Sequence, residues 1–401
     1  MARIKKLQDQ RIAGSRDCRI KGLQNQEMRN QEMQDQRNAG SRDCGIRNCR
    51  IKRWEDQGMK LSIIVPVYNM ASGGKLRYCL DSLLHQTLED YEILAVDDCS
   101  EDESLSILQE YEQQHPGRLR AIASPVNRRQ GGAKNEGLRQ AQGEWIGFVD
   151  SDDWIAPDMY ERLITAAEAA GADLAGCDYS LVGYHTMEVG KIVPNNRPEQ
   201  AGVLDDEKRR SLILDGGSLV VKIFRRSMIL EKQLFFPEHI FYEDNALGNS
   251  YLLLAEHFVY LQEPMYYYLQ HESSTVHTIS PQRCEDRKTA GRLMLEEARR
   301  HGYYEKYLPE LEYSFTHLFY INTLFTYVAG VRGLGYGFVK KLGEEMRHTF
   351  PDFEKNSYYQ ERTHAEEKKL IRMQQRSTLW FLLYYRLLWT YRRWRKKWGS
   401  R

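Results

Sequence analysis

From Lys60 onwards, apolar segments of strand length alternate with segments of helical spacing, and this alternation limits the folds open to the chain. LSIIVPVYN (61–69) is apolar almost throughout, which suits a strand covered on both faces. Similar segments recur about every 30 residues, with helix-like stretches between them. We therefore predict an α/β domain with a parallel sheet. The expected strands are 61–69, 91–100, 119–125 and 144–153, and the expected helices are 74–87, 101–114 and 131–142.

Polar residues follow three of these strands at their carboxyl ends. Tyr68 and Asn69 follow the first strand, Asp97 and Asp98 the second, and the acidic run 150–153 the fourth. Ligands of parallel sheets bind at this edge. One aspartate after a strand can simply cap the next helix, but polar ends on three strands favour a binding site.

Three carboxylates, those of Asp150, Asp152 and Asp153, stand within four positions and repel one another. A divalent metal, a basic side chain or protonation would relieve the repulsion. Oxygen ligands suit Mn²⁺ or Mg²⁺, and substrate phosphates commonly complete the shell of such an ion. We expect Asp152, helped by Asp150, to bind a metal together with a diphosphate. Neither GxxxxGK[ST] nor a GxGxxG after the first strand occurs, so the usual ATP and dinucleotide loops are not expected.

Four stretches together carry a family resemblance: SIIVPVYN, LLHQTLEDYEILAVDDCSED, GGAKNEGL…GEWIGFVDSDDWIAPDM and YEDNAL, in this order. They resemble the family 2 glycosyltransferases over about 59–278. The resemblance implies the GT-A fold, a Rossmann-like and mostly parallel sheet with flanking helices, here followed by a helical C-terminal region. It also implies inverting transfer of a sugar from a nucleotide-diphosphate sugar, usually a UDP-sugar.

The resemblance also implies roles for individual residues. The second acid of VDD, Asp98, would bind the uracil NH, and Asp150 with Asp152 would form the DxD pair at the metal. Asp244 of YEDNA would be the catalytic base, with Glu243 supporting it, although acids at this place can also stabilise a helix N-terminus. The remaining residues expected to bind the nucleotide sugar are Pro66, Val67, Tyr68, Asn69, Lys134 and Ser151.

Two positions depart from the family pattern. Lys134 stands in GGAKN where the family often has arginine, so the charge is kept and the planar fork is lost. Leu269 follows Tyr267 and Tyr268 where the family often has an arginine. Nearby, His271 is a further candidate ligand for metal or diphosphate, although a lone histidine is more often a surface or packing residue.

Residues 1–58 differ from the rest of the chain. RIAGSRDCRI (11–20) returns as RNAGSRDCGI (37–46), in a segment rich in polar residues and poor in large apolar ones. We expect a low-complexity, disordered extension, with a basic RNA-binding arm as the alternative and Met59 as a candidate true start. The expected parts that follow are a glycosyltransferase domain over 59–278, a helical region over 279–375 and a basic aromatic helix over 376–401.

The C-terminal part has no acidic residue after Glu367, while Lys and Arg recur to the end. STLWFLLYYRLLWTYRRWRKKWGSR (377–401) is too short in its apolar part to span a bilayer. It suits a helix lying on an anionic membrane surface. The alternatives are packing on the protein's own core or in a homodimer.

The net charge of +1 does not indicate nucleic acid as a partner. An odd number of cysteines, seven, indicates reduced thiols and a cytoplasmic setting. The C-terminal segment and the family resemblance together predict a peripheral place on the inner face of the cell membrane. The family resemblance implies a metal-dependent hexosyl- or N-acetylhexosaminyl-type transferase acting on a glycan or lipid-linked acceptor in cell-surface polysaccharide synthesis. The alternatives are a non-catalytic nucleotide-sugar-binding scaffold of the same fold and a nucleotidyltransferase.

Overall fold

The computed structural model describes residues 58–270 and 279–398, and for 393–398 only the backbone. The described chain forms two compact units, each built from several segments. Among the described residues, the first unit takes in those up to Asn195 together with 218–239 and 259–269. The second unit takes in 196–217, 240–258 and the residues from Gln270 on. The boundary expected at 278/279 falls at the edge of a segment outside the described residues.

The first unit begins with four parallel strands, as predicted, and their order in the sheet is β3-β2-β1-β4. Apolar side chains fill both faces of β1 and β2, which are buried at every position. This burial explains why their sequences are mostly apolar, with Ser62, Glu92 and Asp97 as the buried exceptions. The strands are β1 (Leu61–Val67), β2 (Tyr91–Asp97), β3 (Leu119–Ala123) and β4 (Trp145–Phe148).

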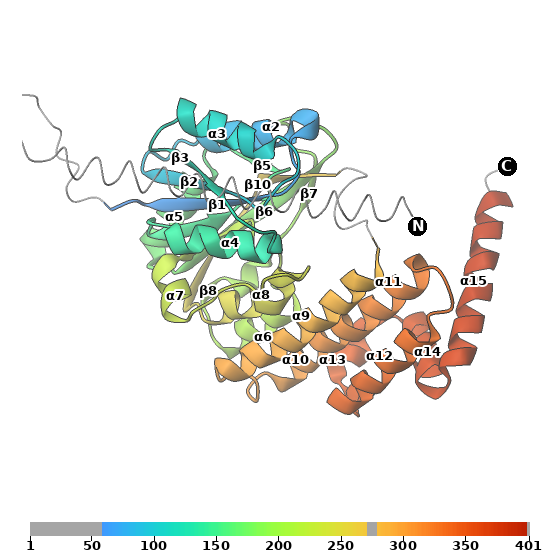
Figure 1. Ribbon diagram of the computed structural model, residues 1–401. Helices are drawn as coiled ribbons and strands as arrows, with labels where there is room; N and C mark the ends of the chain where they lie inside the picture. The colour runs from blue at the N-terminus through green and yellow to red at the C-terminus, as the bar shows by residue number, and fades with distance from the viewer. Residues whose placement is uncertain (1–57, 271–278, 399–401) are drawn as a thin grey trace, which may run out of the picture. The chain divides into compact units, whose positions relative to one another are not determined.

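Helices cover both faces of these strands. Figure 1 shows α2 (Lys75–Leu84) and α3 (Ser104–Gln114) above the parallel strands and α4 (Arg129–Gln140) below them. A Cβ added at Gly137 would come within 2.5 Å of the Ile64 side chain, so glycine lets α4 lie close on β1. All three helices agree with the predicted ranges to within a few residues.

Beyond β4 the sheet becomes mixed, continuing β9-β6-β10-β5 with antiparallel pairs. The long strand β10 and the central strand β9 were not predicted. The remaining elements of the first unit are β5 (Trp154–Ile155), α5 (Met159–Ala170), β6 (Leu174–Val182), β7 (Lys191–Val193), β9 (Lys222–Arg225), α7 (Arg226–Glu231) and most of β10 (His257–Leu269).

The second unit is mainly helical. It contains β8 (Gly202–Val203), which pairs with the first residues of β10. The helix predicted to begin at Glu243 is confirmed as α8 (Glu243–Leu253). The other helices are α6 (Asp206–Leu214), α9 (Pro281–Arg300), α10 (Leu308–Phe315), a π-helix (Thr316–Asn322), α11 (Thr323–Gly330), α12 (Tyr336–Thr349), α13 (Ser357–Arg362), α14 (Ala365–Arg376) and α15 (Thr378–Trp398). Within the described part of the chain, none of the helices is long and apolar enough to cross a bilayer.

Candidate active site

The loops after β1 and β2 are joined at the carboxyl edge of the sheet. The Asp98 N–H donates to the Val67 carbonyl at 2.8 Å. The Asn69 N–H donates to Ser100 Oγ at 3.0 Å, and Asn69 Oδ1 accepts from the Glu101 N–H at 2.8 Å. Asn69 has a φ of 53°, which an asparagine tolerates better than most residues. The sequence therefore holds two polar loops together where a ligand of a parallel sheet would bind.

The predicted nucleotide-binding residues differ in exposure along β1. Pro66 and Val67 are buried at the end of the strand, whereas Tyr68 is 44% exposed and Asn69 is also exposed. Burial and the charges of Glu101 and Asp98 raise the pKa of the Tyr68 hydroxyl, and Arg129 opposes them. Tyr68 and Asp98 are therefore close enough to interact electrostatically.

Asp98 is a buried carboxyl, only 3% exposed. Its Oδ1 accepts a hydrogen bond of 2.8 Å from the backbone N–H of Arg128. Burial raises the pKa of Asp98 to about 6, against the hydrogen bonds from the Arg128 and Arg129 backbone and the Arg128 charge. A buried carboxyl that ionises near neutrality is a recurrent property of binding and catalytic sites.

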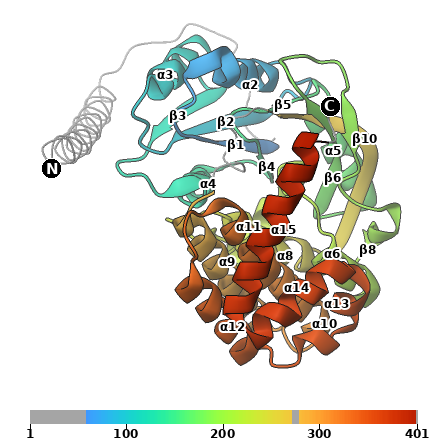
Figure 2. The same ribbon diagram turned by 90° about the vertical axis from the view of Figure 1, so that its right-hand side faces the viewer.

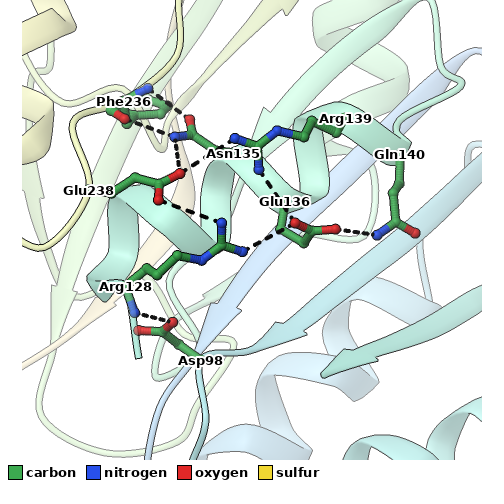
Figure 3. A network of polar contacts seen from close by, with 8 residues as sticks. All are labelled: Asp98, Arg128, Asn135, Glu136, Arg139, Gln140, Phe236 and Glu238. Atoms are coloured by element: carbon green, nitrogen blue, oxygen red, sulfur yellow. Dashed lines mark hydrogen bonds and ion pairs between the residues drawn. The ribbon is translucent and has the colours of Figure 1, made fainter. Parts of the chain in front are cut away.

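A polar network fixes the loop that carries Arg128 (Figure 3). The Arg128 guanidinium lies 3.2 Å from Glu136 and 3.5 Å from Glu238. Arg139 pairs with the same two carboxylates, at 3.4 and 3.5 Å. Asn135 exchanges two hydrogen bonds of 2.8 Å with the Phe236 backbone. The N-terminal part of α4 is thereby fastened to residues 236–238, and the donor to Asp98 is held in place.

Lys134 lies inside this region. It is 5% exposed, and its Nζ is 5.1 Å from the centroid of the Phe236 ring. The interaction is within the range of a cation–π contact. Its expected contact with the nucleotide sugar stays a prediction.

The acidic run after β4 divides into one buried and two half-buried carboxyls. Asp153 is 1% exposed, and its two oxygens accept from the Tyr266 hydroxyl at 2.8 Å and the Leu269 N–H at 2.9 Å. Asp150 and Asp152 are half-buried, and Ser151 between them is buried. Asp153 therefore anchors the loop to β10, while Asp150 and Asp152 are partly accessible to solvent and stay predicted metal ligands.

The electrostatics of this loop are negative. Burial and then the charges of Asp153, Asp152 and Asp150 raise the pKa of the buried Cys79 thiol. No group of three or more metal-binding side chains was found among the described residues. Two half-buried carboxylates in a negative field nevertheless fit a hard cation whose other ligands come from a diphosphate and water. The further candidate ligand, His271, lies outside the described residues.

Asp244 belongs to the second unit and is exposed in the first turn of α8, while the preceding Glu243 is buried. One oxygen of Asp244 accepts from the backbone and the side-chain amide of Asn245, both at 2.8 Å. The role of Asp244 as a base stays a prediction.

The turn before Asp244 is held by α9 within the same unit. The guanidinium of Arg287 donates to the Tyr242 hydroxyl at 2.8 Å and lies 4.5 Å from the centre of that ring. Asp286 accepts from the Phe241 N–H at 3.3 Å. Sequence reasoning missed these residues, and it also missed Arg128, Glu238 and Tyr266, because no local motif marks contacts between distant segments.

A sheet that changes from parallel to mixed, with acidic residues at the carboxyl ends of its parallel strands, is typical of GT-A glycosyltransferases. Residues 62–219 match the family model for glycosyl transferase family 2. This segment of the chain is therefore similar to the family 2 glycosyl transferases.

The chain is 31% identical over 219 residues to the uncharacterized glycosyltransferase YibD of Escherichia coli, covering 54% of this chain and 62% of that one. It is 34% identical over 215 residues to a poly(ribitol-phosphate) beta-glucosyltransferase of Bacillus spizizenii, covering 53% and 32% of the two chains. The chain thus spans less than two thirds of these relatives. The crystal structure of S. aureus TarS 1–349 in complex with UDP has a TM-score of 0.56 at 22% identity, covering 80% of this chain and 91% of that one. This likeness supports the GT-A fold.

Proposed function

We propose that this protein transfers a sugar, with inversion, from a nucleotide-diphosphate sugar to a hydroxyl of a glycan or lipid-linked acceptor in cell-surface polysaccharide synthesis. The observation that carries the proposal is the buried Asp98, held by the Arg128 N–H at the carboxyl edge of the parallel strands. A UDP-sugar is the favoured donor, since a fold relative was crystallised with UDP. A hexosyl or N-acetylhexosaminyl group is the favoured sugar, in keeping with the name of the glucosyltransferase relative.

The residues of this chain have distinct tasks in the proposed reaction. Asp98 accepts the uracil NH, and exposed Tyr68 with Asn69 borders the base. Asp150 and Asp152 would hold Mn²⁺ or Mg²⁺, which would neutralise charge on the departing diphosphate. Asp244 takes the proton from the acceptor hydroxyl as that oxygen attacks the anomeric carbon. Attack from the face opposite the diphosphate inverts the configuration without a covalent intermediate.

Release of nucleoside diphosphate from a panel of nucleotide sugars, with Mn²⁺ or Mg²⁺, tests the proposal. Asp244→Asn is expected to abolish release while donor binding persists, because the neutral amide cannot take a proton. Asp352→Asn, an exposed acid of the second unit, is the matched control. Failure of every UDP-sugar to bind or react would refute the donor assignment.

The second candidate is a non-catalytic scaffold that binds a nucleotide sugar. It predicts that the wild-type protein binds a UDP-sugar with no release of UDP above that of Asp244→Asn. Measured turnover that depends on Asp244 would exclude it.

A further inference from the structure

Helix α15 (Thr378–Trp398) is attached to the second unit by one of its faces. Phe381, Leu382 and Tyr385 on this face are buried. The Tyr385 ring lies 6.1 Å from the ring of Phe325 in α11. Figure 2 shows α15 beside α12 and α14, and both helices contact it. One expected alternative, packing on the protein's own core, therefore accounts for one side of the helix only.

A second face of α15 carries large apolar side chains that are exposed. Trp380 is 69% exposed, Leu383 43%, Leu387 72% and Tyr391 55%. These positions are three, four and four residues apart, so they form one continuous stripe along an α-helix. We call these four residues the α15 stripe. Exposed apolar stripes of this kind mark contact surfaces more often than isolated apolar residues do.

The charge on α15 is of one sign. The helix contains six basic residues and no acidic one, at 386, 392, 393, 395, 396 and 397. Arg392 pairs with Glu366 of α14 at 2.5 Å. An apolar stripe on a basic helix is complementary to a layer with an apolar interior and a negatively charged surface.

We propose that the α15 stripe docks on the surface of an anionic lipid bilayer, with the helix lying in the plane of the interface. Trp380 and Tyr391 suit the headgroup level, where amphipathic rings are favoured. Leu383 and Leu387 would enter the acyl boundary, and the net positive charge of the helix would attract it to anionic headgroups. A second copy of the chain is a poorer occupant, because it would bring a second helix with the same positive charge.

This proposal does not depend on the proposed sugar transfer. Its test is sedimentation of the full chain with phosphatidylcholine vesicles, with and without phosphatidylglycerol. The wild-type protein is expected to bind only the vesicles that contain phosphatidylglycerol, and to bind them less as salt rises. Binding that is equal to both vesicles, or absent from both, would overturn the proposal.

Variants of the stripe sharpen the test. Trp380→Gln with Leu387→Gln is expected to weaken binding by at least about tenfold, since two large apolar groups no longer leave water. Leu334→Gln, at a 46% exposed leucine of the same unit outside α15, is the matched control. An unchanged thermal melting curve and an unchanged circular dichroism spectrum show that the variants are folded.

Light scattering measures the molar mass in solution and so tests the alternative that a second copy of the chain covers the α15 stripe. Undiminished vesicle binding by the double variant would overturn the proposal. Conversion of a dimer to a monomer by the double variant would also overturn it, because the stripe would then join two copies of the chain. A failure of UDP to bind any variant, with vesicle binding intact, would count against the proposed function alone.

Discussion

The Tyr266 hydroxyl donates to Asp153 Oδ2 at 2.8 Å and also accepts from the Asp150 N–H at 3.2 Å. One fully buried tyrosine on β10 thus holds both ends of the acidic run that follows β4. Because Asp153 is occupied in this way, the acids after β4 have separate tasks. Asp153 supports the loop, and Asp150 and Asp152 remain the predicted metal-binding pair.

Tyr266→Phe is expected to destabilise the protein by about 1–3 kcal/mol, because it leaves a buried carboxyl and a backbone N–H without this partner. Denaturant unfolding measures the change. Tyr184→Phe, at a 65% exposed tyrosine of the same unit, serves as the control and should have almost no effect. Equal stability of the two variants would show that the Tyr266 hydroxyl contributes nothing to the loop.

Binding of uridine is expected to depend on the ionisation of Asp98. The pKa of Asp98 is about 6, so its carboxylate accepts the uracil NH fully only above that pH. Affinity for uridine should therefore rise between pH 5 and pH 7, both taken as rough bounds on either side of the titration. Uridine is the probe because it has no phosphate that titrates in the same range. Asp98→Asn should bind weakly with no such rise, and a pH-independent wild type would contradict the assignment.

The same pKa makes a prediction for stability. Asp98 holds its proton up to about pH 6 when folded, but only up to its ordinary value of 3.8 when unfolded. The folded state therefore binds more protons in this window, and stability falls as the pH rises through it. Asp98→Asn should flatten this part of the pH profile of unfolding free energy. A slope that the substitution leaves unchanged would mean that other groups produce it.

Glu238 is expected to act on nucleotide binding through Arg128, without touching the nucleotide. Glu238→Ala removes the carboxylate that Arg128 and Arg139 share, so the donor to Asp98 becomes less fixed. The KM for the donor should rise several-fold, which corresponds to a loss of about 1 kcal/mol of binding free energy. The kcat should be nearly unchanged. Glu238→Gln should be milder, because its amide oxygen can still accept from Asn135.

The control for this prediction is Glu231→Ala, an exposed acid on α7. It should leave KM and kcat at their wild-type values. A fall in kcat with no change in KM for Glu238→Ala would place Glu238 at the chemical step and not at nucleotide binding.

Arg287 is expected to position Asp244. Arg287→Ala frees the Tyr242 ring and hydroxyl, so the turn before α8 keeps only the Phe241–Asp286 hydrogen bond of its two described attachments to α9. A displaced base should lower kcat by about ten- to a hundredfold, with little change in donor KM. Arg287→Lys should recover part of the activity, because lysine keeps the charge without the planar fork. Arg292→Ala, on the same helix and paired with Glu345, is the control.

The parallel strands and their helices were predictable because the pattern of apolar residues within each segment indicates its secondary structure. In β1 nearly every residue is apolar, and in α2 the apolar residues recur at helical spacing. The strand β10 was not predictable, because its first half, HFVYLQE, is only partly apolar and partly exposed. The place of the acids at the strand ends was predictable from sequence. The support of Asp153 by Tyr266 was not, because those residues are 113 positions apart. The ion pair between Arg128 and Glu238 was not predictable either, because in the sequence each of them resembles an ordinary charged surface residue.

The order of strands in the sheet also has a consequence for synthesis of the protein. Strands β1 to β4 are complete once Phe148 has been made, but the neighbour of β4 is β9, which begins only at Lys222. The nascent chain must therefore carry an open and apolar β4 edge while the intervening residues are translated. Such edges invite pairing with other chains. Slow translation between these strands, or a shortage of chaperones, should lower the yield of this protein more than that of a protein whose adjacent strands follow one another in sequence.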